Sequence, residues 1–332
     1  MATYKGIQGY SVQTLASDPS PAASVEGQLW FNSTSSSYKI SMAGVGAWSS
    51  GGAMNVTRAQ DGLAGSQTAA VISGAVAPAA DETLAETYNG TSWTAVNTLN
   101  SGRSLSMGAG TQTDALTISG HDGYLSYSVN VELYNGTSWV EQSGNVNSAR
   151  AQGGGCGLVS TAALIFGGEG LPFPANNAKT ESYNGSTWSE VNVLNTGRYQ
   201  NTGAGSSVSA LTGAGYSTAA TNIVETWNGT SWTAVNAVNT TAEGRMGMGA
   251  NNTTGTIMGG RVSTTYYTNT ESYNGTGWTE VGDLATGRYN GSAVGTAGVG
   301  MLAGGSNPGT GGSTTTEEWT GAPVAVKTVT TS

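Results

Sequence analysis

Six glutamates and six arginines recur along the sequence, and they are the residues with the clearest capacity for chemistry. The glutamates are Glu86, Glu132, Glu181, Glu225, Glu271 and Glu317, and the arginines are Arg58, Arg103, Arg150, Arg198, Arg245 and Arg288. Paired carboxylates can act as acid and base, but a catalytic pair belongs to one site, whereas these residues return once in each repeat. We therefore expect them to pair with one another or with backbone amides as part of a scaffold.

Histidine and cysteine are nearly absent, which excludes several classes of chemistry. The chain has one histidine, His121, and one cysteine, Cys156. Zinc sites and Ser/His/Asp or Cys/His catalysis need clusters of such side chains, and a disulfide within the chain needs a second cysteine. We expect Cys156 to be a small buried residue. The sequence predicts no catalytic residues, no metal site and no cofactor, so we expect a protein that is not an enzyme.

The composition predicts a folded, all-β chain with few charges. Of 332 residues 52 are Gly, and only 9% are charged, where an average soluble domain has about 25%. Nine Trp and fourteen Tyr supply apolar area for a core, so the low charge does not indicate disorder. A net charge of −9 gives no basic surface for nucleic acid. The sequence contains no run of about 18 apolar residues, the length that would predict a membrane-spanning helix.

A repeated motif, Glu-x-Tyr/Trp-Asn-Gly-x-x-Trp, supplies the elements that must position these residues. Its aromatic residue before Asn-Gly falls at Tyr88, Tyr134, Tyr183, Trp227, Tyr273 and, in a degenerate copy, Trp319. Asn-Gly predicts a hairpin with a two-residue turn, in which Tyr88 faces Thr91. An arginine, a small-residue strand and an apolar strand precede each motif, so each repeat is expected to form four strands. The repeated tryptophans are expected to fill the core between repeats.

At these residues the chain resembles the kelch family, whose roughly 50-residue repeats carry a di-glycine after the second strand. The di-glycine is intact at Gly167-Gly168, Gly259-Gly260 and Gly304-Gly305. The resemblance implies a six-bladed β-propeller around a central channel over residues 51–332; a seventh, incomplete blade is the alternative. We expect residues 323–329 to supply the outer strand of the last blade. An alternative role for the arginines is then a ring at the channel mouth that binds an anionic sugar.

Function is expected where the repeats differ. Loops between the second and third strands of each repeat vary over residues 75–82, 121–129, 169–178, 215–221, 261–268 and 306–315. Variable loops on a uniform scaffold are typical of a binding face, although loop drift without a ligand is the alternative. Aromatic residues in these loops suit contact with a glycan or a protein. The predicted ligand-binding residues are Tyr124, Tyr127, Phe173, Tyr216, Tyr266 and Tyr267.

Residues 1–50 precede the repeats and are expected to form a docking segment with a β-hairpin. The stretch from Glu26 to Ser50 resembles a motif near the start of bacteriophage tail-fibre and other virion proteins, and the whole chain resembles virion proteins of marine phages, including cyanophages. This resemblance implies a tail-associated structural protein, located in the virion in multiple copies. It also implies contact with other virion proteins and recognition of a host-surface glycan or protein. The predicted docking residues are Leu29, Trp30, Phe31 and Tyr38.

Three alternatives to this function stay open at the level of sequence. The first is a capsid decoration protein, which differs from a tail protein only in its place on the particle. The second is a propeller that binds or degrades glycans. The third is a bacterial interaction module, which genes for capsid and tail proteins beside its own gene would exclude.

Overall fold

The computed structural model describes residues 12–19, 28–74, 82–122, 126–171, 175–176, 178–321 and 324–329. These residues form strands and turns and contain no helix, so the predicted all-β class is confirmed. None of them belongs to a helix that is long and apolar enough to cross a membrane. The chain divides into two compact units, of which the first comprises Met1–Gly46 with Thr320–Ser332 and the second comprises Ala47–Trp319.

The described residues of the second unit form six four-stranded sheets, which we call blades 1 to 6. Blades 1 to 3 contain β5 (Gly62–Ser66), β6 (Ala69–Ser73), β7 (Ala85–Tyr88) and β8 (Trp93–Val96); β9 (Met107–Thr111), β10 (Asp114–Ile118), β13 (Val131–Tyr134) and β14 (Trp139–Glu141); and β15 (Gly154–Val159), β16 (Ala162–Phe166), β19 (Thr180–Tyr183) and β20 (Trp188–Val191). Blades 4 to 6 contain β21 (Thr202–Ser206), β22 (Ser209–Gly213), β23 (Val224–Trp227) and β24 (Trp232–Val235); β25 (Met246–Met248), β26 (Gly255–Met258), β29 (Thr270–Tyr273) and β30 (Trp278–Glu280); and β31 (Ser292–Gly295), β32 (Val299–Ala303), β33 (Thr316–Thr320) and β4 (Ala47–Ser50).

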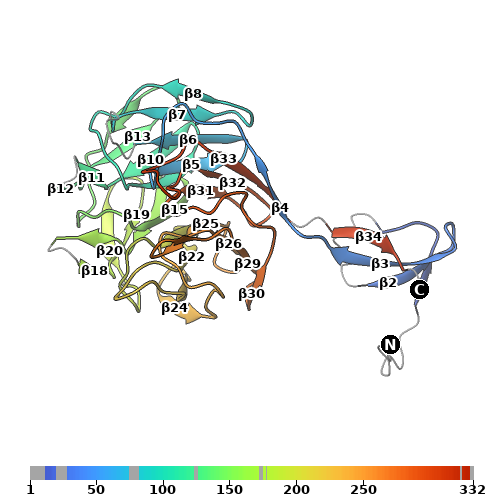
Figure 1. Ribbon diagram of the computed structural model, residues 1–332. Helices are drawn as coiled ribbons and strands as arrows, with labels where there is room; N and C mark the ends of the chain where they lie inside the picture. Colours follow the sequence, from blue (N-terminus) through green and yellow to red (C-terminus); the bar gives the residue numbers. More distant parts are fainter. Residues whose placement is uncertain are drawn as a thin grey trace. The chain divides into compact units, whose positions relative to one another are not determined.

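The blades follow one another around a common centre, so the colours in Figure 1 run round the unit from blue to red. The first strand of each blade is the innermost, and neighbouring inner strands contact one another, including β31 with β5. Three short hairpins project between the second and third strands of blades 2, 3 and 5. They are β11 (His121–Asp122) with β12 (Ser126–Tyr127), β17 (Glu169–Gly170) with β18 (Ala175–Asn176), and β27 (Arg261–Val262) with β28 (Thr265–Tyr266).

Glycine and tryptophan hold neighbouring blades together. At Gly108 in β9 a Cβ atom would lie 2.3 Å from the backbone oxygen of Leu63 in β5, so only glycine allows the two inner strands to approach this closely. Trp93 packs on Tyr88 with ring centroids 5.0 Å apart, and its indole N–H donates a hydrogen bond of 2.9 Å to Thr316 Oγ1 of blade 6. The interblade role predicted for the repeated tryptophans is confirmed.

The hairpin between the third and fourth strands differs from the predicted two-residue turn. In blade 1, Tyr88 pairs with Trp93 rather than with Thr91, so the loop has four residues. The side-chain oxygen of Asn89 accepts hydrogen bonds from the backbone N–H groups of the two residues after the glycine, at 3.0 and 2.9 Å. Gly90 alone of the pair has a positive φ, 91°. The predicted register was wrong because asparagine caps this turn with its side chain instead of adopting the left-handed conformation itself.

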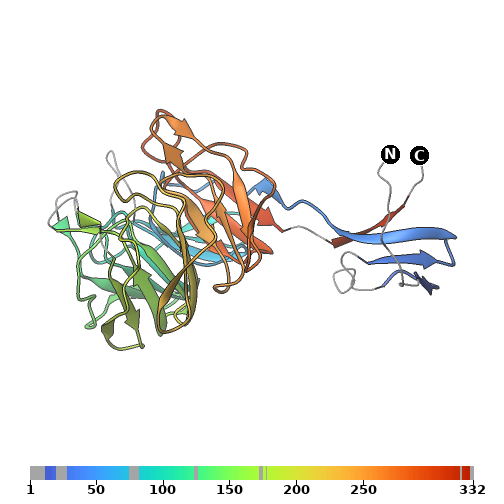
Figure 2. The same ribbon diagram turned by 90° about the horizontal axis from the view of Figure 1, so that it is seen from below.

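Blade 6 is completed by a strand that precedes blade 1 in the sequence. β4 lies beside β33 in one sheet, and the blue and red strands adjoin in Figures 1 and 2. The prediction that residues 323–329 close the ring was wrong. Those residues form β34 (Val324–Thr328), which pairs antiparallel with β3 (Ser37–Ala43) in the first unit. The predicted segments, 1–50 and 51–332, therefore differ from the observed units at both ends of the ring.

Trp48 explains this closure. The degenerate copy around Trp319 lacks the second aromatic residue of the motif, and Trp48 on β4 takes that place, with ring centroids 5.2 Å apart. Its indole N–H donates a 3.0 Å hydrogen bond to Thr270 Oγ1 of blade 5. The same tryptophan-to-threonine bond joins blade 1 to blade 6. The sixth copy of the repeat is thus split between the two ends of the second unit.

The first unit contains a four-stranded sheet in the order β1 (Gln13–Leu15), β2 (Leu29–Asn32), β3 and β34. Trp30 is 2% exposed, and its indole N–H donates to Asp18 Oδ1 at 3.1 Å. Hydrogen bonds from Trp30 and Asn32 lower the pKa of Asp18, with that from Asn32 the larger cause. Trp30 therefore holds this unit together and is not available for docking.

The other predicted docking residues lie on the opposite face of this sheet. Leu29 and Phe31 alternate with Trp30 along β2, and Phe31 pairs with Tyr38 on β3. The two rings meet edge to face, with centroids 5.2 Å apart. Leu29 is 42% and Tyr38 51% exposed, so this face offers apolar and aromatic groups to solvent.

Candidate binding face of the second unit

The repeated arginines and glutamates form buried ion pairs within each blade. The pairs are Arg58–Glu86, Arg103–Glu132, Arg150–Glu181, Arg198–Glu225, Arg245–Glu271 and Arg288–Glu317, and each of these side chains is at most 3% exposed. The predicted structural pairing is confirmed. The alternative of an arginine ring open to an anionic sugar was wrong, because these guanidinium groups do not reach solvent.

Each glutamate also ties the arginine turn to the third strand of its blade. Glu132 Oε2 accepts hydrogen bonds from the backbone and side-chain nitrogens of Asn100, both at 2.8 Å, and its Oε1 accepts one from Arg103 at 2.6 Å. Arg103 donates further to the backbone oxygen of Asn130 at 2.8 Å. Burial lowers the pKa of Arg103, against the charge of Glu132. The polar groups of this arginine–glutamate network bind one another, so few of them are left to bind a ligand.

In blade 5 the arginine of the buried ion pair comes from a different position in the repeat. In blades 2, 3, 4 and 6 a bridge such as Ser104–His121 or Tyr199–Tyr216 begins at the residue directly after the arginine. In blade 5 the corresponding bridge is Glu243–Arg261, and the residue before it is Ala242. Arg245, three residues after Ala242, contacts Glu271 at 2.8 Å. Arg245 therefore departs from the single repeat position at which the sequence placed all six arginines.

Beside these buried pairs lies a set of side chains that changes from blade to blade. In each of blades 2 to 6 one bridge links the arginine turn to the end of the second strand, and we call the residues at these bridges, with Tyr127 and Tyr266, the rim. The bridges are Ser104–His121, Ala151–Glu169, Tyr199–Tyr216, Glu243–Arg261 and Tyr289–Ser306. The backbone geometry is shared and the side chains are not, so the rim is where the repeats cease to be copies.

Half of the rim, over blades 4 to 6, is built from aromatic pairs. Tyr199 and Tyr216 have ring centroids 5.4 Å apart, and Tyr266 and Tyr289 have centroids 5.7 Å apart, edge to face. Arg261 lies 3.8 Å above the ring of Tyr289 and forms a 2.8 Å ion pair with Glu243. All of these tyrosines are half-buried. They present ring edges and hydroxyls on a preorganised surface.

The other half, over blades 2 and 3, contains the titratable cluster of His121, Tyr127 and Glu169. His121 Nε2 lies 3.6 Å from Glu169 Oε1, and the Tyr127 ring meets the imidazole edge to face at 4.6 Å. Burial lowers the pKa of His121 and raises the pKa of Glu169, against a hydrogen bond from Tyr127. Burial and then Glu169 raise the pKa of Tyr127 to about 12. The cluster therefore favours a neutral imidazole at neutral pH.

Inside the rim, the central channel has a small polar end with unpaired acceptors. This end has a volume of about 80 Å³, and its lining includes Gln60, Asp61, Asn201 and Asn290. Side-chain oxygens of these four residues have no hydrogen-bond partner among the described residues. Gln60 and Asn290 have φ values of 50° and 53°, which non-glycine residues seldom adopt. Leu105, Gln152 and Gln200 have positive φ values at the same position of their repeats, so this conformation belongs to the scaffold, and the polar side chains are what distinguish this end of the channel.

The predicted ligand-binding residues coincide only in part with the rim. Tyr127, Tyr216, Tyr266 and Tyr267 are described, and the first three belong to the rim. Tyr124 and Phe173 lie outside the described residues. The predictions missed Tyr199 and Tyr289, each of which directly follows a repeated arginine, so a comparison of the residues after the arginines would have found them. No group of three or more metal-ligating side chains occurs in the described part of the chain.

Comparison with solved structures identifies the fold. The solved structure of YjhT superposes with a TM-score of 0.69 at 15% sequence identity, covering 83% of this chain and 99% of that chain. The second unit is a β-propeller. The fold expected from the kelch resemblance is confirmed, and at this identity the likeness concerns the fold alone. No family model and no curated protein matches the sequence. The candidate site of the propeller therefore rests on its own geometry.

Proposed function

We propose that the protein is a non-enzymatic structural component of a bacteriophage particle and that its propeller binds a glycan or protein on the host surface through the rim. The observation that carries this proposal is the contrast between six copied ion pairs and a rim without copies. A scaffold that repeats its core and varies one ring of surface positions presents a binding face.

A glycan suits the chemistry of the rim better than an acidic ligand does. Aromatic rings such as Tyr199 and Tyr289 offer flat apolar faces and hydroxyls. Tyrosine hydroxyls can exchange hydrogen bonds with the hydroxyl groups of a sugar. Arg261 is already paired with Glu243. We therefore propose that the ligand of the rim is neutral and rich in hydroxyl groups.

The direct test of rim binding uses the full chain on host cells or their surface polysaccharide. Tyr199→Ala and Tyr289→Ala should each weaken binding about tenfold or more, as truncation of a central aromatic residue does. Val208→Ser changes an exposed residue in a hairpin between first and second strands, outside the rim, and should leave binding unchanged. Equal affinities for all three variants would contradict the proposed face.

The particle part of the proposal rests on the N-terminal motif and on the exposed face of Leu29, Phe31 and Tyr38. Mass spectrometry of purified virions should detect the protein in many copies, and its absence from them would overturn this part. Imaging of the particle would assign it to the tail or the capsid. Failure of this test leaves the binding test above intact.

The cluster of His121, Tyr127 and Glu169 favours one second candidate, a glycan-acting enzyme. Its carboxylate occurs in one blade only and is held near an imidazole in a partly desolvated site, as acid–base residues are. A depolymerisation assay decides between the two. Product formation that is lost in Glu169→Gln and retained in Glu243→Gln would favour the enzyme.

A further inference from the structure

One residue of each blade belongs to an inner ring at the polar end of the central channel. Each member is the second residue after the arginine of its blade, or after Ala242 in blade 5, so in blades 2 to 6 it directly follows a rim residue. Over these five blades, four backbone hydrogen bonds of 2.7 to 3.1 Å link each member to the one in the preceding blade. The members are Gln60, Leu105, Gln152, Gln200, Gly244 and Asn290.

The conformation of the inner ring belongs to the scaffold, but its side chains do not follow from that conformation. All six residues have φ values between 50° and 59°, a region that glycine adopts freely and asparagine more readily than most residues. Gly244 and Asn290 fit this preference, whereas Gln60, Gln152 and Gln200 do not. The backbone therefore does not explain why glutamine occupies half of the ring.

The carboxamide groups of these glutamines differ from other carboxamides of the propeller. Gln67 and Asn252, in hairpins of blades 1 and 5, each donate a 3.0 Å hydrogen bond to a backbone oxygen of the preceding blade. Gln60, Gln152 and Gln200 make no side-chain hydrogen bond within the described part of the chain. All three are half-buried. Their amides are therefore placed by the scaffold without serving it.

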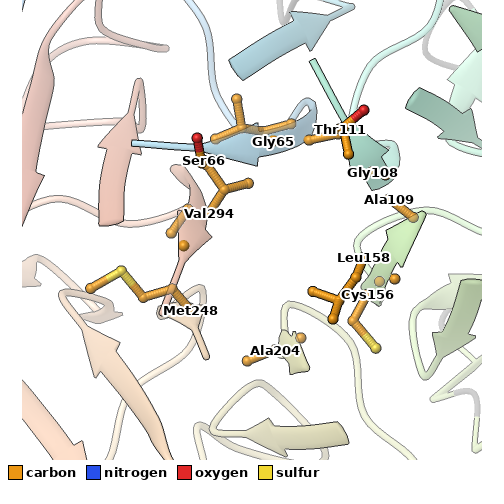
Figure 3. Close-up of a pocket in the computed structure, with 18 of the residues that line it drawn as sticks. Gly65, Ser66, Gly108, Ala109, Thr111, Cys156, Leu158, Ala204, Met248 and Val294 are labelled. Atoms are coloured by element: carbon orange, nitrogen blue, oxygen red, sulfur yellow. The ribbon is translucent and has the colours of Figure 1, made fainter. Parts of the chain in front are cut away.

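The opposite end of the channel lacks a comparable set of free amides among its described residues. Its wall is formed by small residues such as Gly108, Ala109 and Ala204 (Figure 3). One carboxamide, Gln112, belongs to that lining, and it donates to two backbone oxygens of blade 1 at 3.2 and 2.5 Å. Side chains that could recognise a polar ligand are therefore concentrated at the end beside the rim.

The inner ring offers a ligand no unpaired charge from the described residues that line this end. Arg245 lies in the lining, but it is paired with Glu271 at 2.8 Å. Burial raises the pKa of Asp61 to about 8, so this carboxyl is mostly protonated at neutral pH. An ionic group would lose its hydration here without gaining a counter-charge. These surroundings favour a neutral ligand.

A carboxamide presents one acceptor and one donor side by side. Two hydroxyl groups on neighbouring carbon atoms of a sugar match it, because one can donate to the amide oxygen while the other accepts from the amide nitrogen. The space at this end is about 80 Å³, well below the roughly 300 Å³ of pockets that enclose a whole ligand. It therefore suits one edge of a sugar unit rather than an entire ring.

We infer that the inner ring binds one edge of a single sugar unit through pairs of neighbouring hydroxyl groups, and so determines which glycan the rim accepts. This inference rests on the proposed function, in which the rim binds a glycan on the host surface. The tyrosines of the rim contact the sugar from the side, and the amides of Gln60, Gln152 and Gln200 hold its hydroxyls.

Periodate oxidation tests the hydroxyl pairs directly, since periodate cleaves the carbon–carbon bond between neighbouring hydroxyls. The full-length protein is bound to purified host-surface polysaccharide that has been oxidised with periodate and then reduced with borohydride. Its affinity should fall at least tenfold, while polysaccharide treated with borohydride alone should bind as before. Undiminished binding to the oxidised polysaccharide would overturn the inference and leave binding by the rim intact.

Two variants test the ring itself. Gln152→Leu and Gln200→Leu keep the size of the side chain, and leucine is already present at this position in blade 2 as Leu105. Each should weaken binding about tenfold, which corresponds to the two hydrogen bonds lost with one carboxamide. Thermal unfolding of each variant checks that the fold is retained.

Gln142→Leu is the matched control, because it removes a carboxamide that lies outside the inner ring and bonds only to the backbone oxygen of Val140. Its affinity should equal that of the unaltered protein. Weakening by Tyr199→Ala without weakening by Gln152→Leu and Gln200→Leu would overturn the inference and keep the proposed function. Unchanged binding in all of these variants would overturn both.

Discussion

Two kinds of arginine–glutamate pair occur in the propeller, and they differ in burial. Arg150 and Glu181 belong to the repeated set, with both side chains 0% exposed and a contact of 2.5 Å. Arg261 and Glu243 occur in blade 5 alone, at 26% and 13% exposed and 2.8 Å apart. Arg150 also donates a hydrogen bond to a backbone oxygen of its own blade. Arg261 instead lies over the ring of Tyr289 in the next blade.

The difference shows that the burial of an arginine–glutamate pair, rather than its residue types, decides whether the pair belongs to the scaffold or to the candidate site. A buried charge pair cannot lose one partner without leaving the other uncompensated. A partly exposed pair keeps water as a substitute partner. The same two residue types therefore stabilise the fold in one place and form part of the partly exposed rim in the other.

The largest expected effect is the loss of a buried pair. Arg150→Met leaves Glu181 charged and without its partner, so we expect the free energy of unfolding to fall by about 3 to 5 kcal/mol. Urea denaturation followed by tryptophan fluorescence measures this change. A loss below about 1 kcal/mol would show that burial does not distinguish the two kinds of pair.

The next effect is a rescue in blade 5. Arg245→Asn should destabilise the propeller by an amount similar to Arg150→Met. Adding Ala242→Arg restores an arginine at the position used by the other blades, and should recover about 2 to 3 kcal/mol of that loss. Denaturation of the single and double variants measures the recovery. No recovery would mean that the arginine position is not interchangeable between blades.

A buried carboxyl without an ion pair gives the third effect. Burial, opposed by the charge of Arg58, raises the pKa of Asp61 from 3.8 to about 8. The folded state therefore binds a proton that the unfolded state has lost, and the free energy of unfolding falls as pH rises from about 4 to 8. Asp61→Asn removes this slope and should stabilise the protein at pH 8 by at least about 1.4 kcal/mol, the equivalent of one pKa unit.

Denaturation at pH 5 and pH 8 measures this effect. An amide side chain, Asn201, is already present at the equivalent position of another blade. Asn201 occupies the corresponding position in blade 4 and is 3% exposed. A variant that kept the full pH dependence of the unaltered protein would assign the slope to another group.

The smallest effect is expected at the rim. Arg261→Met should change the free energy of unfolding by less than about 1 kcal/mol, because the pair is partly exposed and screened by salt. It also removes the cation above the Tyr289 ring, so binding of the host-surface ligand should change while stability does not. Paired denaturation and binding measurements test this. A large loss of stability would place this pair with the scaffold.

The sequence predicted the architecture because its period of 44 to 49 residues marks each blade by Glu, Tyr or Trp, and Asn-Gly. It did not predict ring closure because Trp48, although 45 residues before Trp93 and so in phase with the repeat, is not preceded by the Glu and Asn-Gly of the motif. The four-residue turn was missed because both turn types begin with Asn-Gly.

The sequence prediction and the rim share some residues but not others. Loop variation indicated the face and Tyr216 and Tyr266, but His121 and Glu169 approach one another from different blades, which no local spacing reveals. A central channel was implied by the kelch resemblance, but its lining residues could not be singled out, because Gly, Ala and Met on the inner strands are indistinguishable in sequence from ordinary inner-strand packing.

The chain passes between its two units twice, after Gly46 and again after Trp319, because β34 returns to pair with β3. One proteolytic cut in either connection therefore cannot release the propeller. After a cut at residue 46, the propeller remains joined to β34, which is held by its hydrogen bonds to β3. After a cut at residue 319, it remains joined to β3 by the peptide chain itself. Release needs both connections to be severed, which makes the attachment resistant to a single nick by a protease.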